Sequence, residues 1–148
     1  MNTPTVEELK QLAQQIPEKI PYLKMLVLFG SRATGEIHAN SDWDFAILCN
    51  PEERESNIRE KPWGYFEVSI ILGEILGINS DEIDIVELNK SSQLISHYVA
   101  RDGKVIYQSN SDEFDSFRKK ALLDKEQMSE IYQGLSQEIE QFLTKWAL

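Results

Sequence analysis

Several features are scarce in this chain of 148 residues, and each scarcity excludes a class of protein. The single cysteine, Cys49, cannot form an internal disulfide and ends an apolar run, so we expect a small buried thiol in a reducing compartment. No stretch approaches the ~20 apolar residues of a membrane span, and the N-terminus lacks the basic and apolar regions of a secretion signal. These absences predict a cytoplasmic protein with no membrane segment.

Basic residues are also scarce, with 15 Lys and Arg against 25 Asp and Glu, which gives a formal charge of -10. This balance argues against sequence-independent binding to a phosphate backbone, so we expect no direct nucleic-acid binding. It is compatible with a basic protein partner. The length suits a single domain, residues 1–148, that buries its own core, and there is no internal repeat or low-complexity linker.

Hydrophobic periodicity indicates alternating helices and strands. Thr5 to Glu8 has the spacing of a helix-capping box, and apolar residues follow at helical intervals until Pro17 ends the pattern. Strands are predicted at 22–29, 42–49, 82–88 and 104–107, and helices at 31–35, 65–76 and about 94–102. The expected fold class is α/β (α+β), a small mixed β-sheet flanked by helices.

Two segments lie outside this alternation. Residues 51–64 are highly charged with almost no apolar anchor, so they are predicted to form a solvated, mobile loop and a candidate lid. From Ser111 to Ala147, apolar residues recur at intervals of three, four or seven, which predicts a long amphipathic helix that Gly134 and Ser136 could split. Such a stripe is more often core than interface, but its length makes the two readings more nearly equal, and we hypothesise that its far end, Phe142 to Trp146, contacts a partner.

The residues that could bind phosphate or metal lie at the ends of predicted strands. Gly30-Ser31 follows the first strand, and ten residues later comes Asp42-Trp43-Asp44. The two-residue period of a strand directs Asp42 and Asp44 to one face and Trp43 to the other. A Gly-Ser turn at a helix N-terminus offers backbone N–H groups and a hydroxyl to phosphates, and paired carboxylates offer oxygens to divalent metals.

A third carboxylate is needed if an acceptor hydroxyl is to lose its proton. Asp84, flanked by Ile83 and Ile85 in the third predicted strand, is the candidate, and we expect it to be more buried than Asp81. Three clustered aspartates without metal would repel one another, so at least one should have a raised pKa.

These motifs together resemble the minimal nucleotidyltransferases (MNT) of the DNA polymerase β-like superfamily. The resemblance rests on Gly30-Ser31, Asp42-x-Asp44, the Ile83 to Val86 strand and the 102–107 segment, and it covers about residues 21–107. Residues from about 111 to 147 would be a helical extension of that core. The resemblance implies the polymerase β-like fold and a catalytically competent enzyme, because both residues of the Gly-Ser pair and all three aspartates are present.

The resemblance also implies roles for the site residues. Gly30 and Ser31 would hold the nucleotide phosphates, Asp42, Asp44 and Asp84 would bind Mg²⁺, with two ions expected, and Asp84 would also activate the acceptor hydroxyl. Proteins of this kind are commonly the antitoxins of HEPN/MNT toxin–antitoxin pairs, which transfer AMP from ATP to a tyrosine of the HEPN ribonuclease toxin. The expected partner is therefore a cognate HEPN toxin in a hetero-oligomer.

Several alternatives remain open at this stage. Arg32 and Ser41 could contact phosphate or orient the aspartates, although Arg32 could equally form a local ion pair. His38 is expected to be an exposed loop residue and His97 a structural one. The substrate could instead be a small molecule of the aminoglycoside type, or the protein could be an antitoxin that binds its toxin without catalysis.

Overall fold

The structure is a computed structural model that describes residues 3–35 and 42–146. Four strands form one mixed sheet in the order β3-β2-β1-β4. β1 pairs antiparallel with both β2 and β4, whereas β2 and β3 are parallel. The strands are β1 (Leu23–Phe29), β2 (Trp43–Cys49), β3 (Ile83–Glu87) and β4 (Lys104–Gln108). The four predicted strands are confirmed to within a residue or two at their ends.

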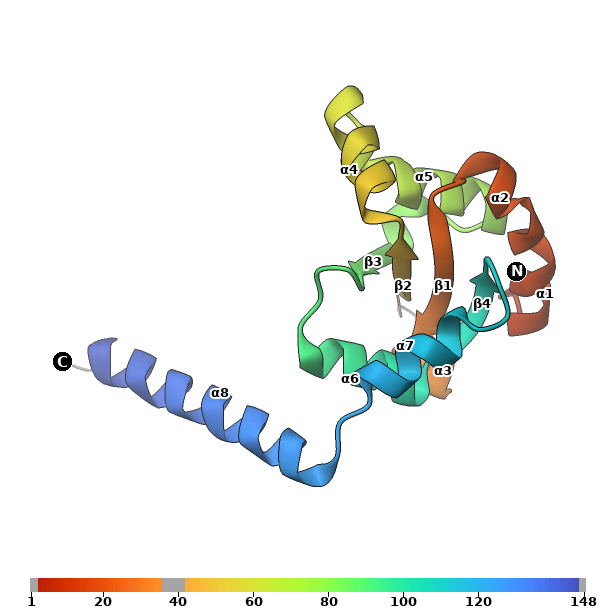
Figure 1. The fold of residues 1–148 in the computed structure, drawn as a ribbon. Helices are drawn as coiled ribbons and strands as arrows, with labels where there is room; N and C mark the ends of the chain where they lie inside the picture. The colour runs from red at the N-terminus through yellow and green to blue at the C-terminus, as the bar shows by residue number, and fades with distance from the viewer. Residues whose placement is uncertain (1–2, 36–41, 147–148) are drawn as a thin grey trace.

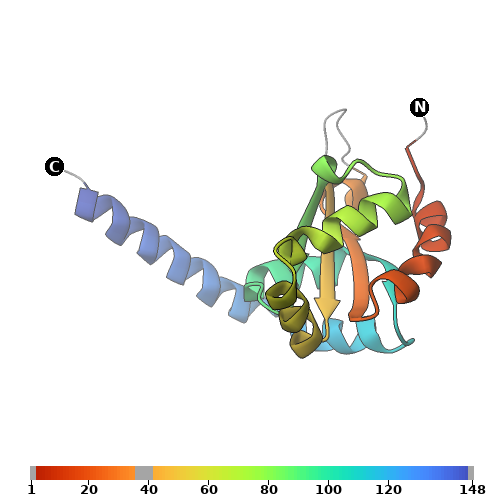
Figure 2. The same cartoon turned by 90° about the horizontal axis from the view of Figure 1, so that it is seen from above.

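Helices cover both faces of this sheet and make a three-layer arrangement (Figures 1 and 2). One face packs against α1 (Val6–Leu12), α2 (Ile16–Lys19) and α5 (Gly64–Leu76), and the other against α6 (Gln93–Asp102) and α7 (Glu113–Ala121). The remaining elements are α3 (Ser31–Thr34), α4 (Pro51–Glu60), α8 (Lys125–Trp146) and short 3-10 turns at Ala13–Gln15 and Ser80–Glu82.

The alternation of side chains along β2 divides the core in two. Phe45 and Ile47, both fully buried, join the larger cluster under α1, α2 and α5. Ala46 lies on the other face, with Val27 of β1 and Val99 of α6. This assignment follows from the two-residue period of a strand, and it determines the face on which Asp44 lies.

The first helix begins and ends for identifiable reasons. The hydroxyl of Thr5 accepts a hydrogen bond from the backbone N–H of Glu8 at 3.1 Å, which confirms the predicted cap. The helical structure does not end at Pro17, however. It tightens into the 3-10 turn after Leu12, and Pro17 occupies the first turn of α2, where its missing N–H has no helical partner to lose.

The prediction of a mobile loop at 51–64 is wrong, because residues Pro51–Glu60 form α4. The side chain of Asn50 caps this helix by accepting from the backbone N–H of Glu53, and Pro51 occupies its first turn. Arg54 is the only residue of α4 that is buried. Its guanidinium anchors the helix to the domain by a polar contact, in place of the apolar contacts that the sequence lacks.

The predicted long C-terminal helix is confirmed as α8, but the 111–147 segment is divided, since the chain breaks between α7 and α8. The break lies at 122–124, well before Gly134, and α8 runs continuously through that glycine. Asp124 and Gln127 cap α8 reciprocally, with Oδ1 of Asp124 accepting from the Gln127 N–H at 2.8 Å and Oε1 of Gln127 accepting from the Asp124 N–H at 3.0 Å.

Helix α8 projects away from the three layers as an isolated arm (Figure 1). Within residues 3–35 and 42–146, no helix combines the length and apolar character needed to cross a bilayer.

Candidate functional site

The strand register brings the predicted aspartates together. Asp44 of β2 pairs directly with Asp84 of the parallel strand β3, and paired residues in a sheet share a face. Asp42 immediately precedes β2, and the two-residue period places it on the side of Asp44. Trp43 points the other way, is 5% exposed and stacks on Phe45 with ring centres 6.2 Å apart. The interpretation of Asp42-Trp43-Asp44 as alternating between site and core agrees with this arrangement.

The electrostatics of the cluster are those of crowded carboxylates. Burial raises the pKa of Asp44 above its ordinary value, and the neighbouring charges of Asp84 and Asp42 raise it further. The predicted rise in the pKa of at least one aspartate is thus confirmed for Asp44. A site that destabilises its own negative charge in this way favours the binding of a cation.

The prediction that Asp84 is buried is wrong: the residue is exposed. β3 lies at the edge of the sheet, and although Ile83 is buried on one face, Asp84 alternates onto the face that is open at this point. The half-buried carboxylate is instead that of Asp44, in a central strand. Asp84 therefore owes its place in the cluster to strand register and not to burial.

The Gly-Ser turn packs directly on Asp44. Gly30 has φ +74° and ψ -157°, a region that only glycine adopts without strain, and a β-carbon there would overlap Oδ2 of Asp44. Ser31 opens α3, and the carbonyl of Gly30 accepts from the N–H groups of Ala33 and Thr34 at 3.1 and 3.2 Å. Both the backbone conformation and the contact with Asp44 therefore favour glycine at position 30.

Arg32 has a contact that sequence reasoning missed. Its guanidinium carbon lies 4.1 Å from the centre of the Trp43 ring, a cation–π contact. Because Trp43 faces away from Asp44, Arg32 is held on the opposite side of β2 in this structure, and contact with a phosphate would require its side chain to move. Ser41 and His38 lie outside the described residues.

The donor set suits magnesium in its chemistry. Three carboxylates offer the hard oxygen ligands that Mg²⁺ prefers. Burial first, and then the charges of Asp84 and Asp42, raise the pKa of Asp44, and a bound cation would favour its ionised form. Among the residues that the structure describes, no three His, Cys, Asp or Glu side chains converge closely enough to make a finished metal site. Metal binding would therefore have to draw Asp42, Asp44 and Asp84 inward.

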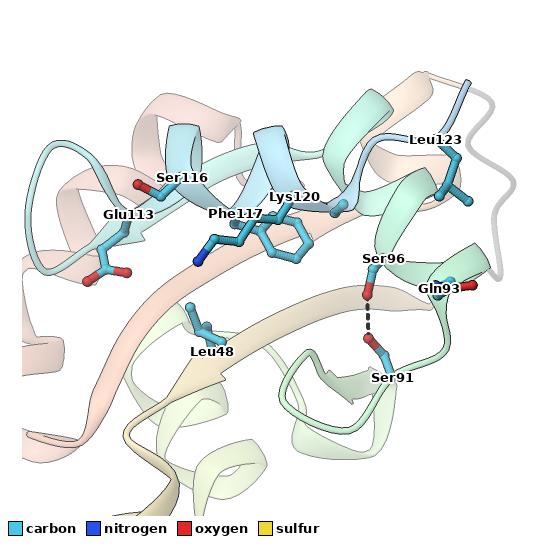
Figure 3. A pocket seen from close by; sticks show the side chains of 10 residues that line it. Leu48, Ser91, Gln93, Ser96, Glu113, Ser116, Phe117, Lys120 and Leu123 are labelled. Carbon is cyan, nitrogen blue, oxygen red and sulfur yellow. Dashed lines mark hydrogen bonds between the residues drawn. The ribbon is translucent and has the colours of Figure 1, made fainter. Parts of the chain in front are cut away.

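A cavity of about 420 Å³ lies on the same side of the sheet, between β2, α6 and α7 (Figure 3). Leu48 and Phe117 form apolar parts of its wall, and the hydroxyls of Ser91 and Ser96 meet across 2.7 Å. The three aspartates do not line it. Since Leu48 stands four residues beyond Asp44 on β2, the cavity is separate from the aspartate cluster.

Next to this cavity, His97 has the structural role expected of it. The imidazole is 6% exposed, and its Nδ1 accepts a hydrogen bond from the backbone N–H of Leu123 at 2.9 Å. Leu123 belongs to the break between α7 and α8. A second contact comes from the next residue of α6, where the hydroxyl of Tyr98 is hydrogen bonded to that of Tyr132 in α8. These two contacts link the base of α8 to α6.

Beyond that base, α8 presents an apolar stripe to solvent. Its members recur at intervals of three and four residues and are 41 to 61% exposed: Leu135, Ile139, Phe142 and Leu143. An exposed apolar stripe on a projecting helix is typical of a protein interface.

Comparison with known proteins places this arrangement in a family. Residues 7–112 match the family described as polymerase beta, nucleotidyltransferase. The chain therefore belongs to this nucleotidyltransferase family, which confirms the resemblance found in the sequence. A relative from Aphanizomenon flos-aquae, named protein adenylyltransferase MntA, is 53% identical over 145 residues, which cover 98% of this chain and 97% of the relative.

Solved structures confirm the fold. A crystal structure described as a toxin–antitoxin with AMP-PNP superposes with a TM-score of 0.54 at 23% identity, over 96% of this chain and 98% of the other. An MNT antitoxin in complex with the tri-AMPylated HEPN toxin of Shewanella oneidensis gives a TM-score of 0.52 at 19% identity, over 95% and 98% of the two chains. Both matches cover at least 95% of this chain.

Proposed function

We propose that this protein transfers AMP from ATP to a tyrosine hydroxyl of a cognate HEPN-family ribonuclease toxin, releases pyrophosphate and thereby neutralises the toxin. The observation that carries the proposal is the parallel pairing of Asp44 with Asp84, beside the turn at Gly30. It is supported by the 53% identical relative named as a protein adenylyltransferase. The proposal takes residues 1–148 as one catalytic domain acting in the cytoplasm, where ATP is available.

Each residue of the cluster has a role in this proposal. Gly30 and Ser31 would hold the nucleotide phosphates, with Ser41 beside them, and Arg32 would join them after its side chain leaves the Trp43 ring. Asp42, Asp44 and Asp84 would bind magnesium, which supplies neutralisation of the triphosphate and stabilises the attacking and leaving oxygens.

The chemical step follows from the position of Asp84. Its carboxylate is exposed, so an acceptor hydroxyl from another chain can approach it and give up its proton. The acceptor oxygen then forms a bond to the α-phosphorus of ATP, and the bond from that phosphorus to the oxygen of the β-phosphate breaks. Positioning and electrostatics suffice for such a transfer, and no covalent enzyme intermediate is required.

The partner would dock on the projecting helix. We assign the far end of α8, Phe142 to Trp146, as the contact with the toxin, because the exposed stripe leads there and the helix projects from the catalytic layers (Figure 1). Deletion of residues 141–148 should weaken the complex and leave the remaining domain folded. Unimpaired binding by that truncated chain would contradict this assignment.

The activity is tested by mass spectrometry with the protein encoded by the neighbouring gene. That protein should be small and helical and carry an Arg-x4-6-His-x-Tyr motif. With ATP and magnesium, the wild-type chain should add AMP to its tyrosine, and the Asp42→Asn/Asp44→Asn variant should add none. Tight inhibitory binding without an adduct would favour an antitoxin that only blocks, and transfer to an aminoglycoside alone would favour a small-molecule enzyme.

A further inference from the structure

A second cluster of exposed apolar side chains lies where α4 meets α5. Trp63, Tyr65 and Phe66 are 58, 60 and 61% exposed, and Ile70, one turn further along α5, is 45% exposed. We call these four residues the aromatic platform. Exposed apolar residues that are scattered singly need no explanation, but four within eight positions, three of them aromatic, are typical of an interaction surface.

The platform is held rigidly by a buried arginine that the catalytic site does not use. Arg54 is 5% exposed, and its Nη1 and Nη2 donate to the backbone carbonyls of Gly64 and Tyr65 at 2.9 and 3.1 Å. Its Nε donates to the carboxylate of Glu87 on β3 at 3.0 Å. A β-carbon on Gly64 would lie 2.6 Å from the carbonyl oxygen of Asn57, so α4 and α5 meet backbone to backbone.

These contacts fix the first residues of α5, from which the aromatic side chains project. The rings of Tyr65 and Phe66 also touch edge to face, with centres 5.3 Å apart. Rigid, large aromatic side chains lose little conformational entropy when they bind, which is why Trp and Tyr dominate the energetics of protein interfaces. The hydrogen bonds of Arg54 therefore hold the platform in one conformation.

The platform lies at the end of the sheet opposite the aspartates. Asp44 and Asp84 are near the starts of the parallel strands β2 and β3, whereas Arg54 binds Glu87, the last residue of β3. Cys49 stands five positions after Asp44 on β2, which corresponds to roughly 17 Å at about 3.3 Å per residue. The platform is also remote from α8, which leaves the domain on another side (Figure 1). It is therefore a surface distinct from both.

The charges around the platform select its occupant. Helix α4 carries exposed glutamates at positions 52, 53, 55 and 60, against the exposed Arg59 and the partly exposed Lys61, which pairs with Glu67. This surface, on a chain of net charge -10, repels nucleic acid, anionic lipid and a second copy of itself. It attracts a basic protein surface.

We propose that the aromatic platform is a docking surface for a basic protein and, resting on the function proposed above, that the basic protein is the HEPN toxin. The aromatic side chains hold the partner once it is bound, and the glutamates of α4 speed its arrival. Contact with the toxin would then involve two separate surfaces of this chain, the platform and the far end of α8.

The experiment measures binding of the neighbouring-gene HEPN protein by surface plasmon resonance, at low and high salt, and AMP transfer in the same samples. The test variant is Trp63→Ala/Phe66→Ala, and the matched control is Ile95→Ala, another exposed apolar residue on α6. We expect the test variant to raise the dissociation constant at least about tenfold, mainly through faster dissociation. The control should bind like wild type. At saturating toxin the test variant should keep its kcat, with a raised KM.

A second variant, Glu52→Lys/Glu60→Lys, tests the electrostatic part of the proposal. It should lower the association rate and weaken its dependence on salt, with little change in dissociation. Thermal unfolding of each variant establishes that it is folded, as expected for exposed positions.

The outcomes separate the two proposals. A folded Trp63→Ala/Phe66→Ala variant that binds the toxin like wild type overturns the platform proposal and leaves the proposed function intact. Wild-type protein that neither binds nor modifies the HEPN protein refutes the proposed function, and the platform proposal falls with it. If sedimentation shows a wild-type dimer that the variant loses, the occupant is a second copy and the platform proposal is wrong.

Discussion

Replacement of Gly30 by alanine separates backbone strain from damage to the site. At φ +74° and ψ -157°, a non-glycine residue costs about 1–3 kcal/mol. The new β-carbon would also overlap Oδ2 of Asp44, and since that atom ends a flexible side chain, the carboxylate can swing aside. The stability loss should therefore be mainly strain, whereas the displaced Asp44 should lower AMP transfer at least about 100-fold, as misplacements of about 1 Å do in active sites.

Gly77 provides the matched control. It caps α5 with φ +69°, and a β-carbon there would meet nothing within 4 Å. Gly77→Ala should cost about 1–2 kcal/mol of left-handed strain. A gain of about 0.4–1 kcal/mol from the stiffer unfolded chain offsets part of the loss in both variants. Each net kcal/mol lowers the Tm of a chain of this size by roughly 2–4 °C.

The assay compares the two variants by thermal unfolding and by incorporation of labelled AMP into the HEPN protein. Both variants should melt below the wild type, and Gly77→Ala should transfer AMP at the wild-type rate. If Gly30→Ala transfers AMP within a few fold of Gly77→Ala, the close packing of the turn on Asp44 has no catalytic consequence and the reasoning fails.

Three further substitutions test two polar contacts that stabilise the fold and the charge of Asp44. Arg54→Met leaves the Glu87 carboxylate buried without its partner, so the free energy of unfolding measured in urea should fall by about 3–5 kcal/mol, and a loss below about 1 kcal/mol would show that the ion pair is dispensable. His97→Phe removes the acceptor of the Leu123 N–H, so this amide should exchange its hydrogen faster than in wild type, while equal rates would contradict the link between α6 and the break. Because its folded pKa is raised, Asp44 favours the folded state below its unfolded pKa near 3.8 and loses that contribution as the pH rises through the raised value. Asp44→Asn should therefore be more stable than wild type at neutral pH, with the difference shrinking towards pH 3, and a pH-independent difference would be incompatible with this explanation.

The strands and the positions of Gly30-Ser31 and Asp42-x-Asp44 at their ends could be predicted from sequence because their signals are local. Apolar runs that end at Gly30 and begin after Asp42 mark β1 and β2, and alternation alone separates Trp43 from Asp44. The pairing of Asp84 with Asp44 is not local, because α4 and α5 lie between the two strands in the sequence, and periodicity does not indicate it. The burial argument for Asp84 failed because a sequence does not reveal that its strand lies at the edge of the sheet.

The missed helix α4 and the missed break after α7 have different physical causes. The partner that anchors Arg54 is Glu87, 33 residues away in the sequence, so no local pattern could indicate that α4 packs on the domain. Its start was nevertheless readable in Asn50-Pro51, a capping residue followed by a first-turn proline. The break was readable too, since Asp124 and Gln127 have capping-box spacing, but the regular apolar stripe across 111–147 obscured it.

The attachment of α8 makes it a lever. Its 22 residues extend about 33 Å at roughly 1.5 Å per residue, and two contacts at its base, at Leu123 and Tyr132, link it to α6. A rotation of about 10° at that base moves the far end by about 6 Å over such a length. In the proposed function, the orientation in which α8 would present a bound partner to Asp84 is set by two hydrogen bonds, from Leu123 to His97 and between Tyr98 and Tyr132. Small changes at these bonds would translate into large changes in which hydroxyl reaches the site.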